Sequence, residues 1–198
     1  MLKKNDSMDE IIKSSLLKTQ SLLNKLLESD TYISSVKDSS TIIIDAISRN
    51  NSVFLAGNGG SAAHSQHFAA EFVSRFNFER RPLPAYALNT DSSILTAVSN
   101  DYGYEKVFER QLSALARPGD VFIGFSTSGK SINIINAFKK ANELDLFSIG
   151  ICGKQGIKGA NLNIEVSIPS ENTPLIQEMH GITSHLICDI VEKSIFKK

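Results

Sequence analysis

The sequence predicts an α/β protein of three layers, in which a five-stranded parallel sheet is covered by helices on both faces. Two observations support this prediction. Short apolar runs of strand length alternate with segments of helical periodicity, which is the order of strands and crossover helices in a parallel sheet. Each run is apolar throughout rather than at alternate positions, so both faces of its strand are expected to be buried. A chain of 198 residues is expected to form a single domain.

Two amphipathic helices are expected before the first strand. Residues 8–28 carry an apolar stripe at helical spacing, and a second stripe follows Ser29 or Asp30, either of which can cap a helix. The two stripes hold more apolar surface than one small sheet needs. Residues 1–50 are therefore interpreted as a helical pair used for packing or oligomerisation, and residues 51–198 as the α/β core.

The first predicted strand, residues 53–56, leads into the stretch around which the fold is organised. The loop GNGGS at residues 57–61 follows it and opens a helix. Glycines allow φ > 0 and a close approach to a ligand, and the helix dipole adds its positive end, so this corner suits an anion such as phosphate. Further along the helix, His67 and Glu71 stand at i and i+4 on one face. The stretch therefore indicates acid–base or metal chemistry on a phosphorylated substrate.

Four more strands are expected further along the chain, at residues 85–88, 121–125, 147–151 and 164–168. The second strand ends at NTDS, and a turn at residues 100–103 is expected to start a helix that runs to about Leu115. The third strand ends at STSGKS, which opens another helix, and residues 175–196 form a long terminal helix. Ligands of parallel sheets bind beyond the carboxyl ends of the strands. GNGGS, NTDS and STSGKS are all rich in donors for an oxyanion.

Residues 124–131 also fit the pattern G-x-x-x-x-G-K-[ST] of nucleoside triphosphatases. Against this reading, the loop interior is rich in hydroxyl groups, and no later strand ends in the Asp that would hold Mg²⁺. The GNGGS loop would also have no function in such an enzyme. A run of hydroxyls at a helix N-terminus suits a single phosphate monoester better, and no nucleotide cofactor is expected.

The composition excludes several classes of partner. There are 21 basic and 21 acidic residues, so no net charge favours nucleic acid or an anionic membrane. The only dense basic stretch, residues 75–81, is interpreted as a solvated loop. Cys152 and Cys188 lie in apolar runs and form no disulfide or zinc-finger pattern. With no signal peptide and no apolar run near the ~20 residues that span a bilayer, the chain is expected to be soluble and cytoplasmic.

Five motifs in order resemble those of the phosphoheptose isomerases, which belong to the sugar isomerase (SIS) domain class. They are GNGGSAAHSQHFAAEF, LNTD, SNDYG, STSGKS and IQEMH…H. The resemblance covers residues 52–196 and implies a flavodoxin-like fold. It implies the conversion of D-sedoheptulose 7-phosphate to D-glycero-D-manno-heptose 7-phosphate, the first step towards the heptoses of bacterial surface glycans such as lipopolysaccharide. It also implies a cytoplasmic homotetramer with one zinc ion per subunit.

The resemblance assigns roles to individual residues. It implies substrate contacts for Asn58, Gly59, Gly60, Ser61, Glu71, Asn100, Asp101, Ser126, Thr127, Ser128, Ser131 and Gln177. It implies a metal-binding set of His67, Glu71, Gln177 and His185, of which Glu71 and His185 are also the acid–base pair. An enediol mechanism needs a base near the C–H bond and an acid near the oxygens, and a carboxylate and an imidazole supply both. Thr173-Pro174-Leu175 departs from the family pattern, because many relatives carry Asp and Arg there.

Two further expectations concern alternatives and assembly. Some relatives are non-catalytic tetrameric adaptors that bind the replication initiator protein, but these lack the carboxylate at the position of Glu71 and the histidine at that of His185. The presence of both residues favours the isomerase.

Gln177 and His185 lie eight residues, or ~12 Å, apart along one helix. Each site is therefore expected to be shared, with His67 and Glu71 of one chain meeting the terminal helix of a neighbour.

Overall fold

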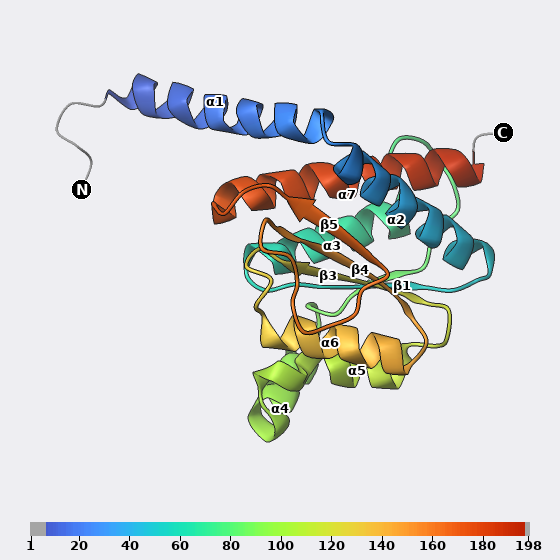
Figure 1. Ribbon diagram of the computed structural model, residues 1–198. Helices are drawn as coiled ribbons and strands as arrows, with labels where there is room; N and C mark the ends of the chain where they lie inside the picture. Colours follow the sequence, from blue (N-terminus) through green and yellow to red (C-terminus); the bar gives the residue numbers. More distant parts are fainter. Residues whose placement is uncertain (1–6, 197–198) are drawn as a thin grey trace.

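A computed structural model describes residues 7–196, and its architecture is the predicted three-layer α/β fold (Figure 1). All strand pairs are parallel, and the strands form one sheet in the order β2-β1-β3-β4-β5. The strands are β1 (Val53–Ala56), β2 (Ala85–Ala87), β3 (Val121–Ser126), β4 (Phe147–Gly153) and β5 (Ile164–Ile168). The strand order reverses between β1 and β3, and ligands of such sheets bind at this switch point.

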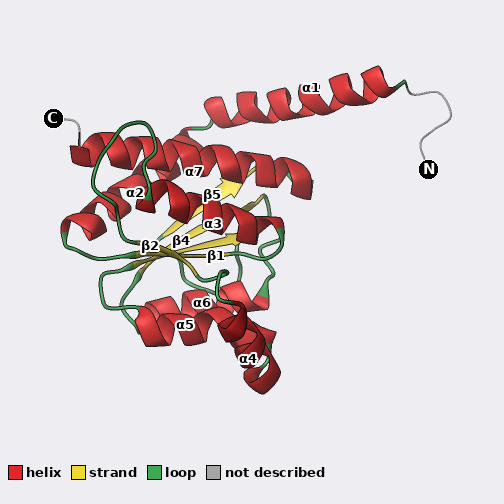
Figure 2. Ribbon diagram, turned by 180° about the vertical axis from the view of Figure 1, so that it is seen from behind, coloured by secondary structure: helices red, strands yellow, loops and turns green. Residues whose placement is uncertain are grey.

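Helices cover both faces of the sheet, as Figure 2 shows from behind. On one face lie α2 (Asp30–Ser48), α3 (Gly60–Val73) and α7 (Thr173–Phe196), and on the other lie α5 (Val107–Leu115) and α6 (Ile132–Glu143). Successive residues of a strand point to opposite faces. Leu55 and Ile123 accordingly belong to the apolar cluster under α2, α3 and α7, whereas Phe54 and Phe122 belong to the cluster under α5 and α6.

The first helix, α1 (Met8–Leu27), projects from the body of the protein (Figure 1). It begins at a capping box in which Ser7 and Glu10 bond each other's backbone. Its buried side chains are Leu22 and Leu26, while Leu16, Leu17 and Leu27 are 62–76% exposed. Within residues 7–196, no helix is long and apolar enough to cross a bilayer.

The prediction of a turn at residues 100–103 is wrong for residues 100–102. The structure has an additional helix there, α4 (Ser92–Tyr102), so Asn100 and Asp101 lie in a last helical turn rather than in a loop. Asp91 caps α4 by accepting the backbone N–H of Ile94, and Gly103, with φ of 91°, makes the turn. The 3-10 helix η1 (Tyr104–Lys106) then leads into α5. The sequence of α4 gives a weak helix signal because Ser, Thr, Asn and Asp are poor helix formers.

Candidate active site

The loops that follow β1 and β3 lie next to each other at the carboxyl edge of the sheet. Every residue of β1 pairs with a residue of β3, and Ala56 lies opposite Gly124. The segments that follow the two strands therefore leave the sheet side by side. Gly59 has φ of 56°, and a Cβ added to it would meet nothing within 4 Å. The outer surface of the GNGGS loop is therefore open to a ligand at the switch point.

The hydroxyl-rich loop after β3 is ordered by its own side chains. Ser126 is buried and donates to Oγ of Ser131 at 3.1 Å, and Ser128 Oγ accepts the backbone N–H of Lys130 at 3.2 Å. Gly129 has φ of 68°, and a Cβ there would lie 1.7 Å from a carbonyl oxygen, so this turn requires glycine. The side chain of Ser131 does not cap α6. Hydroxyl groups at a helix N-terminus with no side-chain cap are suited to binding an anion.

The position of Gly124 argues against a triphosphate-binding loop. This first glycine of the G-x-x-x-x-G-K-[ST] pattern lies inside β3, where it pairs with Gly150. A Cβ on Gly124 would lie 2.5 Å from the ring of Phe138 on α6. The glycine therefore serves the packing of α6 on the sheet and is not part of the loop, which consists of residues 127–131.

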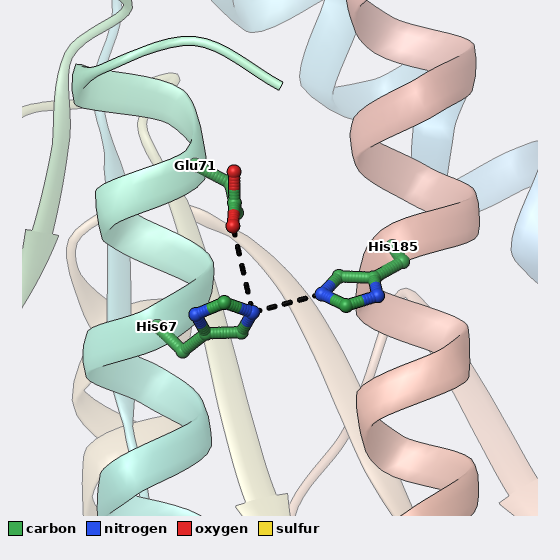
Figure 3. Close-up of side chains that lie close together, drawn as sticks. All are labelled: His67, Glu71 and His185. Atoms are coloured by element: carbon green, nitrogen blue, oxygen red, sulfur yellow. Dashed lines mark hydrogen bonds and ion pairs between the residues drawn. The ribbon is translucent and has the colours of Figure 1, made fainter. Parts of the chain in front are cut away.

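The second half of the candidate site lies between α3 and α7 (Figure 3). Nε2 of His67 lies 2.8 Å from Nε2 of His185 and 3.5 Å from Oε1 of Glu71. The two histidines are exposed and Glu71 is partly buried. One ligand atom of each residue lies within 4.8 Å of the others. We call these three residues the triad, and it is the one such group of His, Cys, Asp or Glu within residues 7–196.

The triad fits a metal ion. Two imidazoles and a carboxylate are common zinc ligands, with Zn–N distances of ~2.0–2.1 Å and tetrahedral geometry. Two nitrogens bound in this way lie roughly 3.3 Å apart, so the rings of His67 and His185 need to separate by only about 0.5 Å. Three protein ligands leave a fourth position open, which is the arrangement of catalytic rather than structural zinc sites.

Gln177, the fourth member of the predicted metal set, lies near the start of α7, beside Gly60 of α3. Its amide lies beside the start of α3, because a Cβ added to Gly60 would be 2.7 Å from Nε2 of Gln177. The helices α3 and α7 run parallel, so Gln177 is level with the GNGGS loop and His185 is level with His67. The expectation that His67 and Glu71 meet a neighbour's terminal helix is wrong for His185, since all three triad residues come from one chain.

A buried ion pair that we did not predict joins the segment after α3 to α7. The side chains of Arg80 and Glu192 are 2% and 1% exposed, and Nε of Arg80 lies 3.0 Å from Oε1 of Glu192. Arg80 also donates to the carbonyl oxygen of Glu71 at 2.7 Å. Burial would raise the pKa of Glu192, but hydrogen bonds from the backbone N–H groups of Phe76 and Asn77 and from Arg80 hold it below its ordinary value of 4.5. The interpretation of residues 75–81 as a solvated loop is therefore wrong for Arg80.

The remaining two histidines lie along the same seam between α3 and α7. His180 is fully buried, and neither ring nitrogen forms a hydrogen bond of normal geometry. Burial lowers the pKa of His180 to about 4, although the nearby backbone of Cys152 raises it. His64 is half-buried. Its pKa is lowered, mainly by burial and to a smaller extent by electrostatic repulsion from His67 and His185. A Cβ on Gly181 of α7 would lie 3.5 Å from the His64 ring.

Asn100 and Asp101 are exposed at the end of α4, where Nδ2 of Asn100 donates to Oδ1 of Asp101 at 2.8 Å. Tyr104, which follows α4, donates its hydroxyl to Oδ1 of Asn58 at 2.9 Å. The structure thus places most of the predicted residues in two groups, one at the loops and one at the triad, and places Asn100 and Asp101 on α4.

Comparisons with known proteins find relatives along nearly the whole chain. Residues 17–153 match the family model described as the SIS domain. A phosphoheptose isomerase from Clostridium acetobutylicum is 45% identical over 190 residues, which are 96% of this chain and 97% of that protein. One from Burkholderia pseudomallei is 47% identical over 188 residues, covering 94% and 95% of the two chains. The solved phosphoheptose isomerase from Neisseria gonorrhoeae is 32% identical and superposes with a TM-score of 0.86, covering 94% of this chain and all of that one.

Proposed function

Because this chain belongs to the phosphoheptose isomerases of the SIS-domain family, we propose that it interconverts D-sedoheptulose 7-phosphate and D-glycero-D-manno-heptose 7-phosphate. The observation that carries this proposal is the separation of an anion-binding loop from an imidazole–carboxylate group. Gly60 at the loop and His67 in the triad are seven positions apart along α3, which is roughly 10 Å. Such a separation suits a seven-carbon sugar, in which the phosphate and the reacting carbons are at opposite ends.

The loops are proposed to bind and orient the substrate. Hydroxyls of Ser126, Thr127, Ser128 and Ser131, together with the N-terminus of α6, bind the phosphate. Residues 58–61, Asn100, Asp101 and Gln177 contact the sugar. Gln177 is assigned to the substrate in its own chain because it lies at the loop end of α3.

The triad is proposed to move the proton. The carboxylate of Glu71 removes the proton from the carbon beside the carbonyl, and His185 exchanges a proton with the oxygens as the enediol forms and collapses. The proton returns to the neighbouring carbon, so one carbon is oxidised as the other is reduced and no external electrons are needed. A zinc ion held by His67, Glu71 and His185 would polarise the substrate oxygens as a Lewis acid.

The protein is also proposed to act as a homotetramer, as the family resemblance implies. Support comes from the exposed apolar side chains of Leu16, Leu17 and Leu27 on the projecting α1, which a monomer leaves in water. Light scattering after gel filtration measures the mass. We expect four subunits, and a smaller mass for a Leu16→Asp/Leu17→Asp variant.

The function is tested by incubating the purified protein with sedoheptulose 7-phosphate in D₂O. We expect the aldose to appear with deuterium on the carbon that exchanged its proton, because the enediol passes its proton through a group in contact with solvent. Glu71→Gln is the matched control and should yield neither aldose nor deuterium. Binding of the sugar phosphate without conversion, with and without added zinc, would contradict the proposal.

A further inference from the structure

A chain of hydrogen bonds that starts at the backbone sets the orientation of the Asn133 side chain. The backbone N–H of Ile134, in the first turn of α6, donates to Oδ1 of Asn133 at 3.0 Å. A backbone N–H can only donate, so the atom that accepts from it must be the amide oxygen. Asn133 is 4% exposed. Its Nδ2 is thereby fixed on the side that faces Asn58.

The orientation passes from Asn133 to Asn58. Nδ2 of Asn133 donates to Oδ1 of Asn58 at 2.9 Å, and Nδ2 of Asn58 donates back to Oδ1 of Asn133 at 2.9 Å. The hydroxyl of Tyr104 donates to the same Oδ1 of Asn58 at 2.9 Å. Both lone pairs of that oxygen are then used. The hydrogen-bonding capacity left on Asn58 is one amide N–H, which has no partner among the residues that the structure describes.

This hydrogen-bond network lies at the switch point of the sheet, where α/β proteins of this kind bind their ligands. Asn58 belongs to the loop after β1 and Asn133 to the helix after β3, so their amide pair bridges the two loops at the switch point. The GNGGS loop is held from its other side by Asn89, which accepts the N–H of Gly57 at 3.2 Å and donates to its carbonyl oxygen at 2.8 Å. Asn58 is half-buried, so part of its side chain faces solvent.

We propose that Asn133 and Tyr104 are positioning residues, which hold Asn58 so that its free N–H donates to an oxygen of the sugar phosphate. The inference rests on the proposed function for the identity of the ligand. Reversing the amide of Asn58 would turn its NH₂ group towards the NH₂ group of Asn133 and leave Tyr104 without an acceptor. Unpaired donors of this kind are unfavourable, so Asn58 is a donor to the substrate and not an acceptor.

Tyr104→Phe is the mildest test, because it removes one hydroxyl from a half-exposed side chain. We expect the Kd for sedoheptulose 7-phosphate and the KM to rise by about 3- to 10-fold, the effect of one ordering hydrogen bond, with kcat nearly unchanged. Tyr86→Phe is the matched control, since Tyr86 is equally exposed, at 52% against 51%, and lies on β2. The control should leave Kd and KM at their wild-type values.

Asn133→Asp tests the direction of the amide. A carboxylate still accepts from Ile134 and from Asn58 but cannot donate to Oδ1 of Asn58. One carboxylate oxygen then opposes that amide oxygen, so Asn58 is expected to be displaced from its position. The Kd should rise at least about 10-fold at pH 8. It should return towards wild type as the pH falls through the pKa of the introduced carboxyl, which burial raises above its ordinary value of about 3.9, because the protonated group can donate again. Asn136→Asp adds the same charge one turn further along α6, where the amide donates to Glu105 rather than to Asn58.

The measurements separate this inference from the proposed function. Conversion by the wild-type protein tests the function, whereas the ratio of variant to wild-type Kd, measured by calorimetry at each pH, tests the positioning roles whether or not turnover occurs. A wild-type Kd for both Tyr104→Phe and Asn133→Asp would overturn the inference, as would an equal loss in Asn136→Asp. If thermal unfolding shows that Asn133→Asp is not folded, the result for Tyr104→Phe decides.

Discussion

The two halves of the site are held in place by different means. At the loops, polar side chains bond one another and the nearby backbone, as Asn58 does with Asn133 and Ser126 with Ser131. At the triad, the side chains contact one another across two helices, and their spacing depends on how α3 packs against α7. The loops are thus an ordered binding surface in their own right, whereas the triad exists only through tertiary packing. Binding and chemistry should therefore respond separately to mutation.

Glu71→Gln is expected to show the largest difference between the effect of a substitution on catalysis and its effect on binding. The amide keeps the shape of the side chain but cannot accept a proton, so kcat should fall by about 10²–10⁴-fold. The loops are unchanged, and the Kd for sedoheptulose 7-phosphate should stay close to the wild-type value. Steady-state kinetics and calorimetry measure the two quantities. A Kd that rises as much as kcat falls would show that the halves are not independent.

The same variant tests whether the triad belongs to one chain. Glu71→Gln and His185→Ala subunits are mixed after dissociation and reassembled, with affinity tags to demonstrate hybrids. Because neither chain carries both groups, the hybrids should remain as inactive as the parents. Partial recovery of activity would mean that Glu71 and His185 come from different subunits.

Loss of the buried ion pair should affect the triad through its packing. Arg80→Met leaves Glu192 buried without its partner, and the free energy of unfolding at pH 7 should fall by about 3–5 kcal/mol in urea titrations. Affinity for zinc should weaken as well, because Arg80 bonds the carbonyl of Glu71. Arg75→Met, which removes a 59% exposed arginine, is the control and should cost less than about 1 kcal/mol.

This loss of stability should depend on pH. The pKa of Glu192 is depressed in the folded protein, so its contribution is complete above its ordinary value of 4.5 and is lost as the pH falls through the lower folded value. The difference between wild type and Arg80→Met should therefore shrink below about pH 4.5. An equal difference at pH 7 and pH 3.5 would contradict this assignment of the carboxylate.

A smaller effect, confined to the loops, is expected from Thr127→Ala. A hydroxyl that donates to a charged phosphate contributes about 1.5–3 kcal/mol, which corresponds to about a 10- to 100-fold rise in Kd. The kcat should change much less, because the triad is untouched. Thr96→Ala removes a hydroxyl that bonds the backbone of α4 and should leave Kd unaffected. An unchanged Kd for Thr127→Ala would remove this residue from the phosphate site.

The smallest expected effect comes from His180, which belongs to neither half. Its pKa of about 4 lies below the ordinary 6.5, so the unfolded chain binds more protons between these values and stability falls as the pH drops through this window. The contribution is roughly 1–2 kcal/mol between pH 7 and pH 5. In His180→Phe this part of the pH dependence should disappear from the melting temperature. The same slope in both proteins would assign the acid sensitivity elsewhere.

The two halves also differed in how far the sequence could predict them. The loops have local features, such as a glycine at the turn and hydroxyl residues directly after a strand, which can be recognised from neighbouring residues in the sequence. Gly129, for example, has positive φ in the structure. His67 and Glu71 were recognised by their spacing on one helix. Their contact with His185 could not be derived, because it depends on parallel packing of helices 118 residues apart.

Two further residues were not predicted for the same physical reason. Arg80 looked like part of a solvated basic stretch, since its partner Glu192 lies 112 residues away. Asn133 carries no motif, and its importance follows from a pairing with Asn58 across 75 residues. Short-range patterns thus indicated candidate ligand-binding residues, but not which side chains hold those residues in place.

The seam between α3 and α7 contains every histidine of the chain, His64, His67, His180 and His185. The histidines can therefore serve as NMR probes of this one region. In a sample labelled with ¹⁵N at histidine alone, each imidazole signal reports on this seam with no background from the rest of the molecule. Eight ring ¹⁵N resonances, two from each histidine, would follow metal binding, substrate turnover and protonation of His180 in a single spectrum.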